Sequence, residues 1–142
     1  MRERIVGIVL LVGAWACSGP LPSPVDASDV RLGAPAELQL RVGQEQRVPE
    51  SVLRVVLDEV LEDSRCPVDV TCVWQGNLRA GFGIAAGSGP TVPFQLNTAV
   101  DPRIAEWNGV RVTIVSVEPA PHERTPIDPA SYAVTIRVEG AH

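Results

Sequence analysis

Hydrophobic and polar side chains alternate along most of the chain from residue 36 onward. The alternation is clearest at 37–42, 77–86 and 132–139, where apolar residues occupy every second position. Because successive side chains of a strand point to opposite faces, these segments are predicted β-strands with one face toward a core. Shorter runs predict further strands at 46–48, 91–96, 104–107 and 110–117.

The segment 51–62 fits two patterns. Its apolar residues recur at the i, i+3, i+4 and i+7 spacing of a helical face. Alternatively, Val52, Val56 and Val60 share one face of a strand, and valine favours β structure. We predict a strand, because every segment that follows has β character.

Turn-forming residues separate these runs. Asn108-Gly109 is the strongest hairpin signal, since both residues accept positive φ. Pro93 favours a sheet edge for 91–96, and the glycines of 77–86 suggest the close approach of a neighbouring backbone. The segment 118–131 is a proline-containing loop. Residues 36–142 are therefore predicted to form an all-β domain, an antiparallel β-sandwich or small barrel of about seven or eight strands.

Residues 1–16 have the features of a signal peptide. Two arginines precede an apolar run too short to span a bilayer as a helix, and Ala14-Trp15-Ala16 marks cleavage before Cys17. This placement resembles a bacterial lipoprotein signal, which implies lipidation of Cys17, and Ser18 resembles outer-membrane sorting. We expect an outer-membrane lipoprotein that faces the periplasm. Secretion or a soluble periplasmic form is the alternative.

Residues 17–35 are rich in proline and serine and lack apolar periodicity, which predicts an extended tether between the anchor and the domain. The formal net charge is −5, and this disfavours nucleic acid as a partner. All twelve basic residues are arginine, so the chemistry of a lysine Schiff base or a P-loop lysine is excluded.

Three cysteines in an exported protein leave one odd thiol. Lipidation of Cys17 removes it and leaves Cys66 and Cys72 to pair in an oxidising compartment. Five residues separate the pair, which permits the Cα distance that a disulfide needs. The spacing is not C-x-x-C, and the two histidines lie in a loop and at the last residue, so we expect a structural disulfide without a metal or cofactor.

Polar residues crowd around this pair. Asp63 suits a side-chain turn, and Arg65 is a candidate fork that holds carboxylates or carbonyls of this corner together. Trp74 is more typical of a core residue than of a ligand platform, and Gly76 turns the chain. Asp63, Arg65 and Trp74 are nevertheless the candidates for a binding surface. The carboxylates of 58–69 also suggest calcium, but their spacing fits no EF-hand loop.

The run Glu62-Asp-Ser-Arg-Cys-Pro67, followed by Cys72-Val-Trp-Gln-Gly76, resembles the D-S-R-C-P…C-x-W-x-G core of uncharacterised bacterial envelope lipoproteins. The resemblance is specific only in this core and extends loosely over residues 52–139. It implies export, a disulfide and a β domain. No activity is established for that family, so the resemblance carries over no catalytic residue.

Three classes of function follow. The first is a non-enzymatic envelope protein, held to the membrane through Cys17, that binds an envelope protein, a glycan or a small ligand or has a structural role. The second is a periplasmic hydrolase, for which Ser64 and His122 are the available residues, although no G-x-S-x-G elbow occurs. The third is a metal-binding β-sandwich, which is disfavoured because Met1 is the only methionine. We expect the first.

Overall fold

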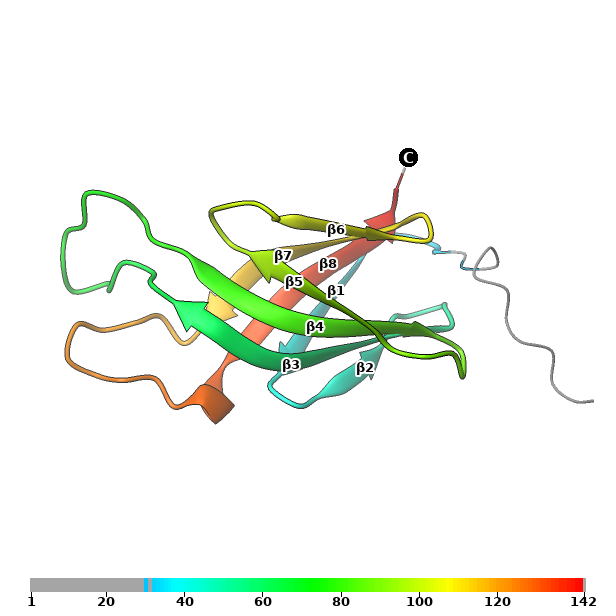
Figure 1. The fold of residues 1–142 in the computed structure, drawn as a ribbon, viewed down its shortest axis with the longest axis horizontal. Helices are drawn as coiled ribbons and strands as arrows, with labels where there is room; N and C mark the ends of the chain where they lie inside the picture. The colour runs from blue at the N-terminus through cyan, green and yellow to red at the C-terminus, as the bar shows by residue number, and fades with distance from the viewer. Residues whose placement is uncertain (1–29, 31, 142) are drawn as a thin grey trace, which may run out of the picture.

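The computed structural model describes residue 30 and residues 32–141, which form two four-stranded antiparallel sheets packed together (Figure 1). The predicted all-β sandwich is therefore confirmed, and the first strand begins at Ala36. The strands are β1 (Ala36–Arg41), β2 (Glu45–Arg47), β3 (Leu53–Asp63), β4 (Leu78–Ala86), β5 (Val92–Asn97), β6 (Ile104–Trp107), β7 (Val110–Glu118) and β8 (Ala133–Gly140). The predicted signal peptide, Cys17 and most of the tether lie outside the described residues.

The two sheets have the strand orders β1-β8-β7-β6 and β2-β3-β4-β5. Strand β5 is thus an edge strand, as Pro93 predicts, and Pro93 lies opposite Gly83 of β4. The β6–β7 hairpin turns at Asn108 and Gly109, whose φ angles are 48° and 75°. The predicted Asn-Gly hairpin is confirmed.

The core fills the space between the sheets. The predicted inward faces of the first and last strands are confirmed, since Leu38, Leu40, Val134 and Ile136 are buried. Between them pack fully buried side chains from the second sheet, among them Leu53, Val55, Leu57, Phe82 and Leu96.

Strand β3 confirms the strand prediction for 51–62, but a bulge between Leu57 and Glu59 means that the three valines of the prediction do not share one face. After the bulge, Val60 lies opposite the buried Ala80 and packs against the core. Leu53, Val55 and Leu57 point inward, whereas Val52 is 40% exposed. A period of two defines two faces without saying which one meets the second sheet. Pairing with β4 decides it here, because Val55 lies opposite Ile84 and Leu57 opposite Phe82, both of which are buried.

Strand β4 is buried on both faces, including Gly81, Gly83 and Ala85. The expected close approach of a backbone is not what surrounds Gly83. A Cβ atom there would overlap the side chains of Thr91 and Val56. The glycine therefore makes room for side chains on the outer face of the sheet.

The loops gather at the two ends of the sandwich (Figure 1). The loops 64–77, 98–103 and 119–132 share one end, on the left in Figure 1. The β4–β5 and β6–β7 turns and the start of β1 lie at the opposite end. Within the described part of the chain, no helix is long and apolar enough to cross a membrane.

Candidate functional site

The loop 64–77 joins β3 to β4 and carries the predicted Cys66–Cys72 disulfide, which is confirmed with a Cα–Cα distance of 6.0 Å. Two backbone bonds form the neck of the loop: Ser64 N donates to Asn77 O at 2.7 Å, and Cys66 N donates to Gln75 O at 2.9 Å. The bridge thus closes the tip of a loop beyond a paired neck. It does not join two strands.

Gly76 makes this neck sterically feasible. Its φ is 74°, in the left-handed region that side chains disfavour. A Cβ atom on Gly76 would overlap the carbonyl oxygen of Ser64. The prediction that Gly76 turns the chain is confirmed. Glycine is required here because the backbone of Ser64, on the other side of the neck, approaches its Cα closely.

Arg65 acts as the predicted fork. Its Nε donates to Asp63 Oδ1 at 2.8 Å and its Nη2 to Asp63 Oδ2 at 2.6 Å. Its Nη1 also donates to Val117 O at 3.1 Å, and its Nη2 to Pro119 O at 3.0 Å. These bonds connect the end of β3 to β7 of the other sheet, so Arg65 braces the two layers beneath the loop.

Tyr132 completes this cluster, because its hydroxyl donates to Asp63 Oδ2 at 2.9 Å. Burial by itself raises the pKa of Asp63, but the hydrogen bonds from Arg65 and Tyr132 outweigh it and hold that pKa below its usual value. Burial, together with the hydrogen bond to Asp63, raises the pKa of Tyr132 to about 12. At neutral pH the cluster is therefore a carboxylate held by a guanidinium and a neutral phenol.

A second loop supports the first. Asp69 Oδ1 accepts a hydrogen bond from Glu123 N at 3.0 Å, and Val68 N donates to Pro121 O at 3.0 Å. The exposed His122 ring is 3.8 Å from the carboxylate of Asp69 through Nδ1. The disulfide loop is thus held from outside by the segment 121–123 as well as from below by Arg65.

The tip of the braced loop is apolar and open to solvent. Its exposed side chains are Val68 (63%), Val70 (36%), Val73 (105%) and Trp74 (60%), and we call them the apolar tip. The expectation that Trp74 is a core residue is wrong. Its loop extends past the ends of the two sheets, so no second sheet covers its side chain (Figure 1).

Beside Trp74 lies a hollow of about 570 Å³, which we call the Trp74 hollow. Its wall combines charged and amide side chains from β3, β4, β5 and the loop 98–103. Asn77 fixes that loop, since its Nδ2 donates to Asn97 Oδ1 at 2.8 Å and its Oδ1 accepts from Ala99 N at 3.0 Å. Its lining includes the side chains of Glu62, Trp74, Asn77, Arg79, Gln95 and Asp101.

Sequence reasoning missed Arg79 and Gln95. Both belong to strands that alternate as expected, but their meeting depends on the register in which Gly81 lies opposite Gln95 and Arg79 opposite Asn97. Of the three predicted surface residues, Trp74 lines the hollow. Asp63 and Arg65 do not line it; their side chains are only 11% and 15% exposed and are bonded to each other.

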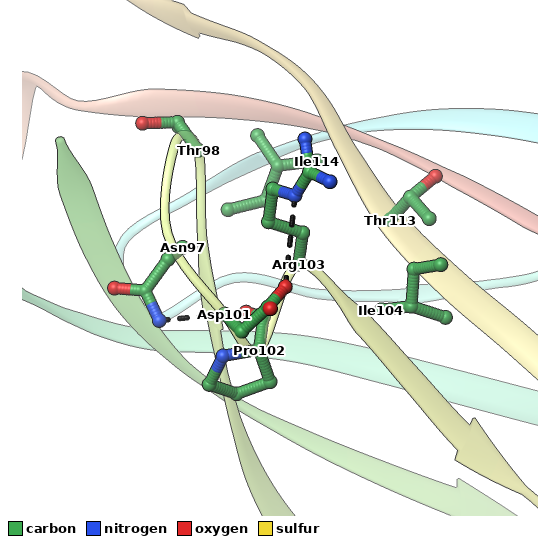
Figure 2. A pocket seen from close by; sticks show the side chains of 8 residues that line it. All are labelled: Asn97, Thr98, Asp101, Pro102, Arg103, Ile104, Thr113 and Ile114. Atoms are coloured by element: carbon green, nitrogen blue, oxygen red, sulfur yellow. Dashed lines mark hydrogen bonds and ion pairs between the residues drawn. The ribbon is translucent and has the colours of Figure 1, made fainter.

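A second hollow of about 610 Å³ lies on the other side of the loop 98–103 and shares Asn97, Asp101 and Pro102 with the first (Figure 2). Asn97 Nδ2 donates to Pro102 O at 3.4 Å, and Arg103 Nε is 3.7 Å from Asp101 Oδ1. The loop is therefore a ridge between two hollows. The remaining lining of the second hollow is Thr98, Ile104, Thr113 and Ile114.

The residues considered for catalysis are not brought together by any contact in the described structure. The hydroxyl of Ser64 donates to Asn77 O at 3.0 Å and accepts from Asn77 N at 3.3 Å, which places it in the neck of the loop. His122 is exposed beside Asp69. Among residues 32–141, no group of three His, Cys, Asp or Glu side chains is arranged to hold a metal ion.

No protein-family model, curated protein or solved structure matches the chain.

Proposed function

We propose that the chain is an exported, lipid-anchored envelope protein that binds a partner through the end of the sandwich that carries the disulfide loop. The observation that carries the proposal is the apolar tip. Val68, Val73 and Trp74 are each at least 60% exposed, although they lie on a loop closed by a disulfide. Clustered apolar side chains in water are a common mark of an interaction site.

The bracing of the loop supports a binding role. Arg65 holds it from below, and the bond from Glu123 N to Asp69 holds it from the side. A loop that is already ordered loses little conformational entropy when a partner binds, so more of the contact energy becomes affinity. Loops placed by a rigid sandwich are also where such domains usually bind.

The position of the tip fits an anchor at Cys17. The chain enters the domain at the start of β1, at the end of the sandwich opposite the disulfide loop (Figure 1). An anchor that precedes this entry leaves the apolar tip free to meet an envelope protein or glycan. Outer-membrane attachment toward the periplasm remains our proposal on the strength of Cys17 and Ser18.

Hydrolysis and metal binding have less support than a binding role. In the described part of the chain, no group of three His, Cys, Asp or Glu side chains is arranged to hold a metal ion. The hydroxyl of Ser64 is engaged with the backbone of Asn77, and the only histidine in the described chain is exposed beside Asp69. Neither arrangement supplies a nucleophile in contact with a base.

Site-specific photo-crosslinking in the native envelope tests the proposal. A diazirine amino acid replaces Val73 at the tip or, as the control, Ser88 in the exposed β4–β5 turn at the opposite end. We expect a discrete, reproducible adduct from position 73 and none from position 88. Identical labelling from the two positions would refute a binding surface at the tip.

The anchor has a separate test. A mass spectrum of the mature protein from its host is expected to show acyl groups on Cys17 and the loss of two hydrogens for the Cys66–Cys72 bridge. An unmodified Cys17 would refute lipid attachment and leave the binding proposal to the crosslinking result.

A further inference from the structure

We infer that the Trp74 hollow binds a neutral carbohydrate, with Trp74 as the stacking platform and Arg79 and Gln95 as hydrogen-bonding side chains. The inference rests on the proposed binding function and names the class of ligand. It comes from three features of the hollow: an exposed aromatic side chain, an arginine side chain to which the described residues supply no hydrogen bond, and a balanced set of donors and acceptors.

Trp74 supplies a flat apolar surface at the edge of the hollow. It is 60% exposed yet lines the cavity, so a ligand in the hollow has access to the indole. The C–H faces of a sugar ring are apolar and slightly positive, and they pack well against the electron-rich face of an aromatic ring. The disulfide ends at Cys72, two residues before Trp74, and restricts the backbone that leads to the indole.

Arg79 lies in the hollow with its donors unused. Its Nε is buried without a hydrogen-bond partner among the described residues, and its Nη2 is 3.7 Å from Glu62 Oε2, beyond hydrogen-bond distance. The side chain remains 43% exposed, so its terminal nitrogens are accessible. The guanidinium of Arg65, by contrast, donates hydrogen bonds to Asp63 and to two backbone carbonyls. A ligand oxygen would give Arg79 the hydrogen bonds that the chain does not.

The charges of the hollow favour a neutral ligand. The cation of Arg79 faces the carboxylate of Glu62, and Asp101 lies 3.7 Å from Arg103. The amide of Gln95 offers both a donor and an acceptor. A hydroxyl group also donates and accepts, so a polyhydroxylated ligand can use both kinds of group at once. An anion would meet two carboxylates and a chain of net charge −5.

The hollow has room for such a ligand. Its volume of about 570 Å³ falls within the range usual for small-molecule sites. The surrounding polar wall does not suit an apolar peptide, whose side chains would leave Arg79 and Gln95 without partners. The apolar tip and the hollow share only Trp74.

The test is binding of the disulfide-intact mature protein to a panel of neutral oligosaccharides: cello-, chito-, malto- and manno-oligomers, with oligogalacturonate as the acidic comparison. Affinity is measured by calorimetry. We expect saturable binding to at least one neutral series, a loss of about tenfold or more in Trp74→Ala and in Arg79→Gln, and retention in Trp74→Phe. Arg111→Gln is the matched control, because its exposed pair with Glu106 lies outside the hollow.

No saturable binding to any neutral series would overturn the inference. Exclusive binding to oligogalacturonate, or an unchanged affinity in Trp74→Ala, would overturn it as well. The crosslinking experiment at position 73 tests the proposed binding function independently of the sugar panel, since Arg79→Gln leaves the valines of the tip intact. An adduct from position 73 together with a negative panel would keep the binding function and reject the carbohydrate.

Discussion

Arg65 donates two hydrogen bonds to Asp63, from Nε to Oδ1 at 2.8 Å and from Nη2 to Oδ2 at 2.6 Å. Asp63 is the last residue of β3, and the same guanidinium reaches the carbonyl of Val117 on β7. The pair therefore links the two sheets at the point where the disulfide loop leaves the domain. The exposed surface beyond this point depends on a mostly buried ionic cluster below it.

Arg65→Ala is expected to lower the free energy of unfolding by about 3 kcal/mol, because it leaves a mostly buried carboxylate without its cation. Arg65→Lys is expected to recover only part of this loss, since an ammonium group cannot reproduce the fork. Chemical denaturation measures both. Arg137→Ala is the control: its pair with Glu37 is about half exposed, and removing it should cost under about 1 kcal/mol. Equal effects of the two alanine variants would contradict the bracing role.

The pKa of Tyr132 can be measured without interference from other tyrosines, because it is the only tyrosine in the chain. It therefore reports on the cluster with Asp63 and Arg65. Ultraviolet titration of the folded protein should give a pKa of about 12, whereas the unfolded chain should titrate near the ordinary value of about 10. Since folding raises this pKa, the associated stability is complete below about pH 10 and is lost as the pH rises toward 12. Asp63→Asn should lower the tyrosine pKa in the folded state. A titration unaffected by Asp63→Asn would show that the hydrogen bond does not contribute.

Gly76→Ala is expected to be among the most damaging glycine substitutions. The new methyl group would overlap the carbonyl of Ser64 in addition to holding a positive φ, so a loss of at least about 3 kcal/mol is expected. Gly43→Ala is the matched control, because Gly43 has a φ of 77° and open space around its Cα. It should lose about 1 kcal/mol from the backbone alone. Thermal or chemical denaturation distinguishes the two, and similar losses would show that the neck can adjust.

Removal of the disulfide should act mainly on the loop. The double variant Cys66→Ala with Cys72→Ala should lose about 2 kcal/mol, as the chain-entropy model predicts for so short a loop. Amide hydrogen exchange should accelerate over residues 66–75, including the Cys66 N–H that bonds Gln75 O. The amides of β8 serve as the internal reference. Unchanged exchange at 66–75 would mean that Arg65 and Asp69 hold the loop without the bridge.

Strand positions were predictable because they depend on local chemistry. Alternation located β1, β4 and β8, and Asn108-Gly109 located the β6–β7 turn, since few other pairs accept two positive φ values. The pairing of Cys66 with Cys72 followed from cysteine parity and short spacing. The fork role of Arg65 was also predicted, although only the structure supplied its partners Val117 and Pro119.

The buried faces of the strands and the exposed surface of the domain were less predictable from the sequence. Alternation in 51–62 placed Val52, Val56 and Val60 on one face of a strand. In the structure Leu53, Val55 and Leu57 point to the core, and after the bulge between Leu57 and Glu59 it is Val60 that packs against it. Which face of a strand is buried depends on packing against the second sheet and not on the alternation of apolar residues along the strand.

By itself, the sequence determined an all-β domain, its main turns and its covalent bridge, because each depends on residues that are neighbours or near neighbours in the chain. Tertiary structure alone decided that Trp74 faces solvent, that Arg79 meets Gln95 and Glu62 in one hollow, and that Tyr132 bonds Asp63. These arrangements depend on segments that lie far apart in the chain. Their register and stacking depend on the energy of the whole packed sandwich, which no local pattern encodes.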